Sequence, residues 1–151
     1  MNLIPNEALV PIYQDHPKNI SGGTGGWVGD LFIVCGGNSF QGKDYYKECY
    51  RIGKENTSFH GNMKERRKGS ASIVLDDKLW IIGGIDDSEE VKRTTEYISA
   101  HDSSQKDGPE LPIGLASHAV VKVNETLSML IGGFVGVNNT RERSHTKCIY
   151  C

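Results

Sequence analysis

The sequence has no long hydrophobic run and no large excess of one charge. No apolar stretch approaches the roughly 20 residues that a bilayer-spanning helix needs, and residues 1–10 lack the basic region and continuous apolar segment of a signal peptide. The formal net charge is only −2 over 151 residues. Because such a chain has no long-range attraction for nucleic acid or an anionic membrane, we expect neither as a partner.

Catalytic and metal-binding motifs are also missing from the sequence. Gly-x-Ser-x-Gly, His-Glu-x-x-His and P-loop patterns do not occur, and the five histidines are scattered singly. Cys148 and Cys151 have the spacing of half a zinc site, but no second Cys or His pair stands at ligand spacing. The acidic segment 86–90 lacks the spacing of an EF-hand. We therefore predict no metal, no cofactor and no enzymatic activity.

What the sequence does contain is glycine, 18 residues in all, in a repeating pattern. Three times a run of apolar residues ends in a glycine pair, and the pairs lie 47 and 49 residues apart. These pairs are Gly36-Gly37, Gly83-Gly84 and Gly132-Gly133. Three such matches at a nearly constant spacing indicate an internal repeat.

Each repeat has the same expected order of elements. An alternating strand leads to a polar turn, as at 76–78 and 124–126, and then to the apolar strand with its glycine pair. Thirteen residues past the second glycine come Tyr50 in the first repeat and Tyr97 in the second. The periodicity is two and not 3.6. We predict an all-β chain of four-stranded antiparallel units, as in β-propeller blades, with a lead-in segment at 1–20 and repeats at about 21–66, 67–114 and 115–151.

These residues resemble the kelch repeat. The resemblance rests on an apolar strand and Gly-Gly followed about a dozen residues later by Glu-x-Tyr or Cys-Tyr, and on Gly-Pro-Glu-Leu-Pro at 108–112 before His118. More narrowly, Cys35-Gly-Gly with Cys49-Tyr50 is similar to kelch-repeat proteins of arthropods. The usual Trp of the outermost strand is missing, and Cys49 and Cys148 align with Glu96. The resemblance implies a partial kelch-type β-propeller of about three blades.

The repeat predicts structural roles for the glycine pairs and for the two tyrosines. A glycine pair ends the apolar strand where the backbone turns sharply and passes close to the next blade. We expect the rings of Tyr50 and Tyr97 to be buried between blades, with each hydroxyl on a backbone partner. Propellers close with 4–8 blades. We therefore expect this chain to be a fragment, the missing blades being supplied by the rest of a longer chain or by another chain.

The cysteines and the glycosylation sequons bear on the compartment of the protein. A hairpin could bring Cys35 and Cys49 close enough for a disulfide, although two buried free thiols are the alternative. Four Asn-x-Ser/Thr sequons occur, of which we take Asn56 and Asn124 as glycosylation candidates. Both observations favour a secreted protein slightly over a cytoplasmic one.

Function in a propeller is carried by loops on one face of a rigid scaffold. Here the variable loops after the glycine pairs are 38–43, 85–93 and 134–144, and they are polar and of unequal length. We predict a non-catalytic module that binds a protein partner. The candidate binding residues are Asn38, Ser39, Phe40, Asp86, Asp87, Glu89, Val135, Asn138 and Arg141.

The resemblance leaves two alternatives open. One is the substrate-recognition propeller of an intracellular ubiquitin-ligase adaptor, which the kelch resemblance also suggests. A remoter one is a galactose-oxidase-like enzyme, whose copper ligand motifs are not recognisable in this sequence.

Overall fold

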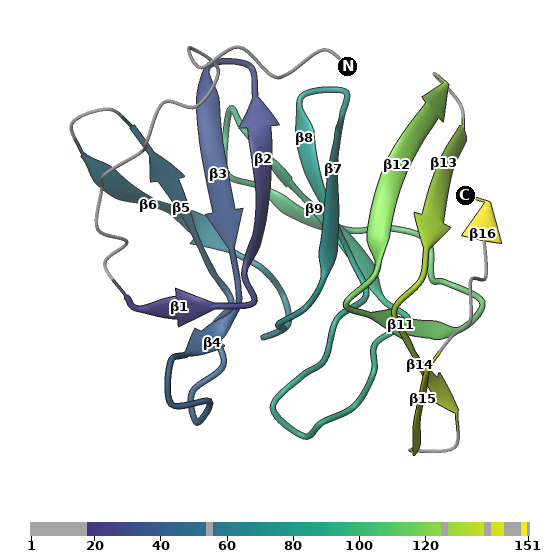
Figure 1. Cartoon of the computed structure of the whole chain (residues 1–151). Helices are drawn as coiled ribbons and strands as arrows, with labels where there is room; N and C mark the ends of the chain where they lie inside the picture. Colours follow the sequence, from purple (N-terminus) through teal and green to yellow (C-terminus); the bar gives the residue numbers. More distant parts are fainter. Residues whose placement is uncertain (1–17, 54–55, 125–126, 138–139, 144–148, 151) are drawn as a thin grey trace, which may run out of the picture.

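A computed structural model describes residues 18–53, 56–124, 127–137, 140–143 and 149–150. Within these ranges every regular element is a β-strand, so the prediction of an all-β chain is confirmed. Three sheets follow one another side by side in the order of the sequence, and each lies inside one predicted repeat (Figure 1). Among the described residues, no helix has the length and apolar character that a membrane crossing requires.

The first and second sheets are antiparallel and four-stranded, as predicted. The first consists, in spatial order, of β2 (Thr24–Val28), β3 (Leu31–Cys35), β5 (Glu48–Ile52) and β6 (Thr57–Asn62). The second consists of β7 (Ala71–Leu75), β8 (Lys78–Ile82), β9 (Thr95–Ser99) and β10 (Gln105–Asp107). The acidic turn between β7 and β8 is tight because Asp76 and Asp77 both have a positive φ, of 50° and 55°, as a two-residue hairpin loop requires.

The third sheet repeats the inner strands of the first two. Its described strands are β12 (Ala119–Asn124), β13 (Leu127–Ile131) and β16 (Ile149–Tyr150). In β13, Leu130 pairs with Val120 on one side and with Ile149 on the other. This is the position of Ile81 in β8, which pairs with Ser72 and Glu96. The alternating strand, the apolar strand and the glycine pair therefore recur three times.

The core lies between the sheets and not inside any one of them. Ile33 and Cys35 of the first sheet pack against Leu79 and Ile81 of the second, and all four are buried. A second buried hydrophobic cluster contains Ile82 of the second sheet and Leu130 of the third, together with Leu111, Leu115 and Val135. Because both faces of the central sheet are covered, its apolar strand is continuous in sequence.

The two tyrosines are not equivalent, because they lie on opposite faces of their sheets. Tyr50 pairs with Val34 across β3 and β5, whereas Tyr97 pairs with Trp80, which occupies the place of Ile33 in β8. The connection after the glycine pair is one residue longer in the first repeat, so the tyrosines face opposite sides. Both rings are half-buried.

Each tyrosine ring packs on an aromatic ring of its own sheet. Tyr50 meets Phe59 with the ring centroids 6.0 Å apart, and Tyr97 meets Trp80 at 4.8 Å. The same one-residue difference changes the counterpart of Glu96. In the strand register, the residue of the first repeat that corresponds to Glu96 is Tyr50, whereas the sequence alignment indicates Cys49.

Neighbouring repeats are joined at the inner edge by backbone hydrogen bonds. Ser117 N donates to Gly69 O at 2.7 Å, and Gly69 N donates to Gly22 O at 2.8 Å. All three residues have a positive φ between 52° and 66°. A glycine adopts this conformation without a steric penalty, whereas Ser117 does so at some cost.

Short additional sheets form beside the glycine pairs. β1 (Ile20–Ser21) pairs with β4 (Asn38–Ser39), and β11 (Gly114–Ala116) pairs with β14 (Phe134–Val137), which also pairs with β15 (Thr140–Arg143). They lie in the lower part of Figure 1, while the β2–β3 and β7–β8 turns lie at its upper edge. We call the lower side, with segments 38–46, 85–93 and 134–143, the loop face, and the opposite side the turn face.

Candidate functional site

The loop face brings together the segments that follow the three glycine pairs. Figure 1 places β4, the long connection between β8 and β9, and the β14–β15 hairpin on the same side of the sheets. Each of these segments begins at a glycine pair whose residues all have a positive φ. The three loops that were selected from the sequence therefore share one surface.

The first loop is a short, well-held hairpin. Asn38 bridges Tyr45, Ser39 N donates to Asp44 O at 2.8 Å, and Gly42 N donates to Ser39 O at 2.7 Å. Gly42 takes the left-handed conformation that closes the turn, with a φ of 75°. Phe40 stands at the tip of the hairpin with 89% of its surface exposed.

The first and second loops are braced against each other. The Tyr45 hydroxyl donates to the Glu89 carboxylate at 3.0 Å, although 44 residues separate the two in sequence. The Lys68 ammonium lies 4.7 Å from the centre of the Tyr45 ring, a favourable cation–π distance. Because of these contacts, the first two loops form one preorganised surface.

The acidic second loop is organised around Asp86. Its carboxylate accepts hydrogen bonds from Ser88 N, Ser88 Oγ and Glu90 N, at 2.8–3.0 Å. The Lys92 ammonium lies 2.6 Å from the other carboxylate oxygen. Burial alone would raise the pKa of Asp86, but the bonds from Lys92 and Ser88 hold it below its usual value. A lysine therefore occupies the position where a cation would bind.

The candidate binding residues differ in what they can contact. Phe40, Asp87 and Glu89 are exposed, and Ser39 is half-buried. Asn38 and Val135 are buried, so these two position the loops and do not meet a partner. Asn138 lies outside the described residues, and Arg141 is described only as part of the backbone of β15.

A depression of about 830 Å³ opens beside Phe40 on the loop face. Its wall is formed by β1, the first hairpin and Tyr46, with Lys18 and Lys43 contributing positive charge. The Lys18 ammonium is fixed by Glu48 at 2.5 Å, and it lies 4.3 Å from the centre of the Tyr46 ring. The depression is therefore lined by aromatic, amide and cationic groups.

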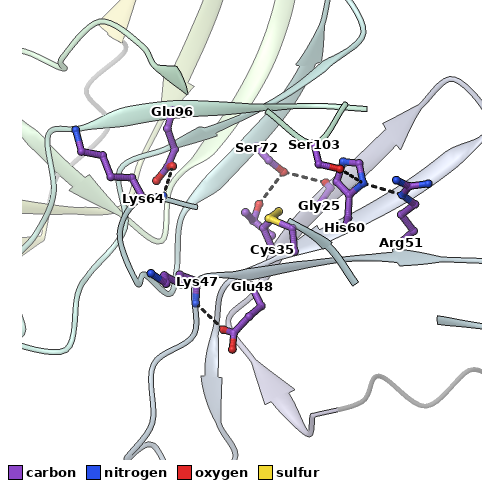
Figure 2. The surroundings of a disulfide bond; sticks show 12 residues. Gly25, Cys35, Lys47, Glu48, Arg51, His60, Lys64, Ser72, Glu96 and Ser103 are labelled. Atoms are coloured by element: carbon purple, nitrogen blue, oxygen red, sulfur yellow. Dashed lines mark hydrogen bonds between the residues drawn. A yellow bond between two sulfur atoms is a disulfide. The ribbon is translucent and has the colours of Figure 1, made fainter. Parts of the chain in front are cut away.

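Sequence reasoning missed a buried ion pair at the boundary between the first two repeats. The Arg67 guanidinium lies 2.8 Å from Glu96, and both side chains are only 1% exposed. The same guanidinium donates to Gly83 O at 2.9 Å and to Thr94 O at 3.0 Å. Figure 2 shows Glu96 also receiving the Lys64 backbone N–H, at 2.7 Å. The sequence places Arg67 in a basic run, 64–68, that reads as a solvated loop.

The predicted disulfide between Cys35 and Cys49 is confirmed (Figure 2). The two cysteines pair directly across β3 and β5, and both are buried in the core between the first two sheets. Beside them, Ser72 Oγ of the second sheet donates to Gly25 O of the first at 2.8 Å. This region therefore joins the two sheets by polar contacts as well as by apolar packing.

Two histidines are buried at contacts between repeats. His60 of β6 accepts from Arg51 at 2.7 Å, and its other ring nitrogen lies 2.9 Å from Ser99 O of the second repeat. Burial, together with the positive charge of Arg51, lowers the pKa of His60. His118 is packed between Gly83 and Gly133, and burial lowers its pKa to about 4. Both imidazoles are held neutral and have structural positions.

The described residues contain no group of three or more His, Cys, Asp or Glu side chains that could hold a metal ion. The side chains of Asp86, Arg67 and His60 bond to backbone groups and to neighbouring side chains instead.

Comparison with known proteins supports the fold. No protein-family model matches the chain. The chain is 29% identical over 129 residues to an N-acetylneuraminate epimerase of Salmonella arizonae, which is 79% of this chain and 32% of that protein. It is 26% identical over 155 residues to the proteins of the same name from Salmonella typhi and Salmonella enteritidis, covering 90% of this chain and 39% of theirs.

The chain thus spans about a third of the length of the curated relatives that it matches. The repeated four-stranded sheets and this distant similarity agree on the fold class. The chain is a partial kelch-type β-propeller, distantly similar to N-acetylneuraminate epimerases.

Proposed function

We propose that this chain is a non-catalytic binding module that recognises a protein partner through its loop face. The observation that carries the proposal is the bracing of the first two loops, in which the Tyr45 hydroxyl bonds to Glu89. A surface that is preorganised in this way loses little conformational entropy on binding. The exposed aromatic side chain of Phe40 is of the kind enriched at protein interfaces.

The test compares variants of the two faces. A photoreactive cross-linker on the chain would be used to capture partners from the native source. Asp87→Lys replaces an exposed negative charge on the loop face by a positive one. Asp30→Lys makes the same replacement at an exposed position on the turn face. We expect one protein to be captured by the wild type and by Asp30→Lys but not by Asp87→Lys combined with Phe40→Ala. Equal capture by all the variants would contradict the proposal.

The distant relatives favour one further candidate, an enzyme that acts on a sugar. They are named as epimerases of N-acetylneuraminate, and the chain spans only about a third of their length. Incubation of the chain with N-acetylneuraminate, followed by NMR, would detect conversion of one epimer to another. Turnover that is abolished by a loop-face variant would replace the binding proposal with an enzymatic one. A galactose-oxidase-like activity would in addition require copper to be found in the purified protein.

We further propose that the module is extracellular, like the arthropod kelch-repeat proteins to which its cysteine pattern is similar. The Cys35–Cys49 disulfide supports this, because such bonds persist in oxidising compartments. Asn56 precedes β6 and Asn124 ends β12, and both are exposed on the side opposite the loop face, where glycans would leave the binding loops accessible. Peptide mapping of native protein should find glycans at these positions. Bare asparagines and free thiols would favour the intracellular adaptor instead.

The outer sheets suggest how the rest of the propeller is supplied. Trp27 and Phe59 lie on the face of the first sheet that points away from the second, and they are 58% and 57% exposed. Phe32 and Val34 on this face correspond to Leu79 and Ile81, which the first sheet buries completely. A further blade of a longer chain, or of another chain, would cover this face in the same way.

A further inference from the structure

We propose that Asn19 carries an N-linked glycan whose first sugar lies on the ring of Phe40, at the rim of the loop face. This inference rests on the proposed extracellular module and adds a modification site to its binding surface. Asn19-Ile-Ser is one of the four sequons of the sequence, and Asn19 is exposed. It directly precedes β1, which lies in the lower part of Figure 1, whereas Asn56 and Asn124 lie on the opposite side.

The pairing of β1 with β4 places Asn19 opposite Phe40. In that pairing Ile20 lies across from Ser39, so the next step of the same register brings Asn19 across from Phe40. Directly opposed side chains of an antiparallel pair lie on the same face, with their Cβ atoms about 4.5–5.5 Å apart. In agreement with this, both residues are exposed and both line the depression of about 830 Å³. A sugar on the Asn19 amide would therefore stand next to the Phe40 ring.

The two strands hold the sequon and the ring in fixed positions. Ser21 Oγ donates to Asn38 Oδ1 at 3.1 Å, which ties β1 to β4. The turn that bears Phe40 is closed by Ser39 N, which donates to Asp44 O at 2.8 Å, and it leaves the ring 89% exposed. A sugar attached to the opposite strand has a high effective concentration at this ring. It therefore removes apolar surface from water without the entropy cost of capturing a free ligand.

The wall of the depression suits the neutral sugars that begin an N-linked glycan. Lys43 is followed by Asp44, and the charge of Lys18 is balanced by Glu48, so the charges of the wall cancel. N-acetylglucosamine has an apolar face of C–H groups for the Phe40 ring, and its hydroxyl and acetamido groups can bond to the polar wall. A volume of about 830 Å³ is in the range of small-molecule sites. A glycan held here would form part of the surface that the partner meets.

The modification is a group transfer from an oligosaccharide carried on a lipid pyrophosphate. The side-chain nitrogen of Asn19 attacks the anomeric carbon of the first sugar and loses one proton. A C–N bond forms, and the bond from that carbon to the phosphate oxygen breaks, its electron pair leaving with the lipid pyrophosphate. The hydroxyl that completes the sequon is that of Ser21.

Glycopeptide mass spectrometry of the native protein tests the modification. Cleavage after Lys18 and Lys43 releases segment 19–43, in which Asn19 begins the only sequon. We expect this peptide to carry a glycan that begins with N-acetylglucosamine. In protein from a secreting host, Asn19→Gln and Ser21→Ala should each abolish the modification, whereas Ser21→Thr keeps the sequon and should retain it. A bare Asn19 in the native protein would overturn the inference.

NMR of the whole chain, with its glycans trimmed to one sugar per site, tests the contact with Phe40. The ring current of Phe40 should shift C–H or N-acetyl signals of the Asn19 sugar upfield from their positions in a short glycopeptide of residues 18–22. Phe40→Ala should remove this shift and leave Asn19 modified. The matched control is Phe59→Ala, which removes another exposed ring that does not lie on the loop face and should leave the shift unchanged. Unshifted signals, or a shift that survives Phe40→Ala, would refute the contact.

The pattern of glycosylation separates this inference from the proposed function. If Asn56 or Asn124 carries a glycan and Asn19 is bare, the module is extracellular and this inference alone fails. If all three asparagines are bare and the cysteines are free thiols, the extracellular proposal fails as well. Capture of the partner is measured separately, with Asp87→Lys, and its loss would support the loop face whether or not Asn19 is modified.

Discussion

The first and second sheets share the register of their three inner strands but are fastened by different side chains. Where the first sheet joins β3 to β5 by the Cys35–Cys49 disulfide, the second has Ile82 opposite Thr95. Where the second sheet places Glu96 in a buried ion pair with Arg67, the first has Tyr50 on an open face. The hydrogen-bond ladder and the glycine turns are common to both sheets.

This comparison indicates that backbone pairing and glycine geometry define the repeat, while each blade has its own means of fastening. A covalent bond costs no desolvation, whereas a buried ion pair must compensate for removing two charges from water. The two sheets should therefore respond differently to changes at these positions. Four predictions, from the largest expected effect to the smallest, test that difference.

Removal of the ion pair should have the largest effect. Glu96→Ala leaves the buried Arg67 guanidinium without its carboxylate, and we expect a loss of about 3–5 kcal/mol in the free energy of unfolding. Glu65 also contacts Arg67, but its side chain is 34% exposed, so Glu65→Ala should cost less than about 1 kcal/mol. Urea denaturation measures both. Equal costs would mean that the burial of Glu96 does not matter.

The disulfide should come next. Cys35→Ala with Cys49→Ala opens a loop of sequence separation 14, which we expect to cost about 3 kcal/mol. The first sheet can also be given the residues of the second, as Cys35→Ile with Cys49→Thr. This pair should lose less stability than the alanine pair, because the second sheet packs there without a covalent bond. A greater loss for the exchange than for alanine would refute the equivalence of the two sheets.

The first glycines of the second and third pairs offer a comparison of close approach. Both Gly83 and Gly132 have a positive φ, of 61° and 71°. A Cβ on Gly83 would overlap the carbonyl oxygen of Leu115, whereas no described atom lies within 4 Å of one on Gly132. Gly83→Ala should therefore destabilise the fold by about 1–3 kcal/mol more than Gly132→Ala. Similar melting temperatures would show that only backbone strain matters.

The smallest effect concerns His118, which occupies the position of Ser70 in the second repeat. Its pKa in the folded chain is about 4, against an ordinary value of 6.5. As pH falls below 6.5, His118 takes up a proton in the unfolded chain before it does so in the folded chain. The stability that the neutral His118 contributes is therefore fully present above pH 6.5 and is lost as pH falls toward 4. His118 should change the free energy of unfolding by at most about 1.4 kcal/mol per pH unit.

Replacing His118 by serine, as in the second repeat, provides the control for that slope. His118→Ser should flatten the dependence of the free energy of unfolding on pH between 6.5 and 4. His60, whose pKa is also lowered, contributes a slope of the same sign and remains in the variant. An unchanged pH profile would mean that His118 is not held neutral by burial.

Much of the fold follows from the sequence, because glycine pairs and period-two patterns report directly on the local backbone. The order of strands, the Asp76-Asp77 turn and the Cys35–Cys49 bond were all predictable. The faces of Tyr50 and Tyr97 were not, since a one-residue change in loop length reverses them without altering the spacing from Gly-Gly to tyrosine. Register is determined by pairing, which a motif count does not contain.

The candidate site shows the same division. The three loops could be found from their positions after the glycine pairs, and Phe40 from its place among polar residues. Asn38 and Val135 are buried where β1 pairs with β4 and where β11 pairs with β14. These two partner strands are distant in sequence or lack a strong local pattern, so the sequence alone does not predict the burial. The Arg67–Glu96 pair joins residues 29 apart, and only the packed structure brings them together.

Amide hydrogen exchange with a bound partner tests the central claim, recognition by the loop face, most directly. With the captured protein bound, we predict slower exchange in segments 39–46 and 86–90. The turns at 29–30 and 76–77 should be unaffected. Protection of the turns with no change in those two loop segments would contradict the account.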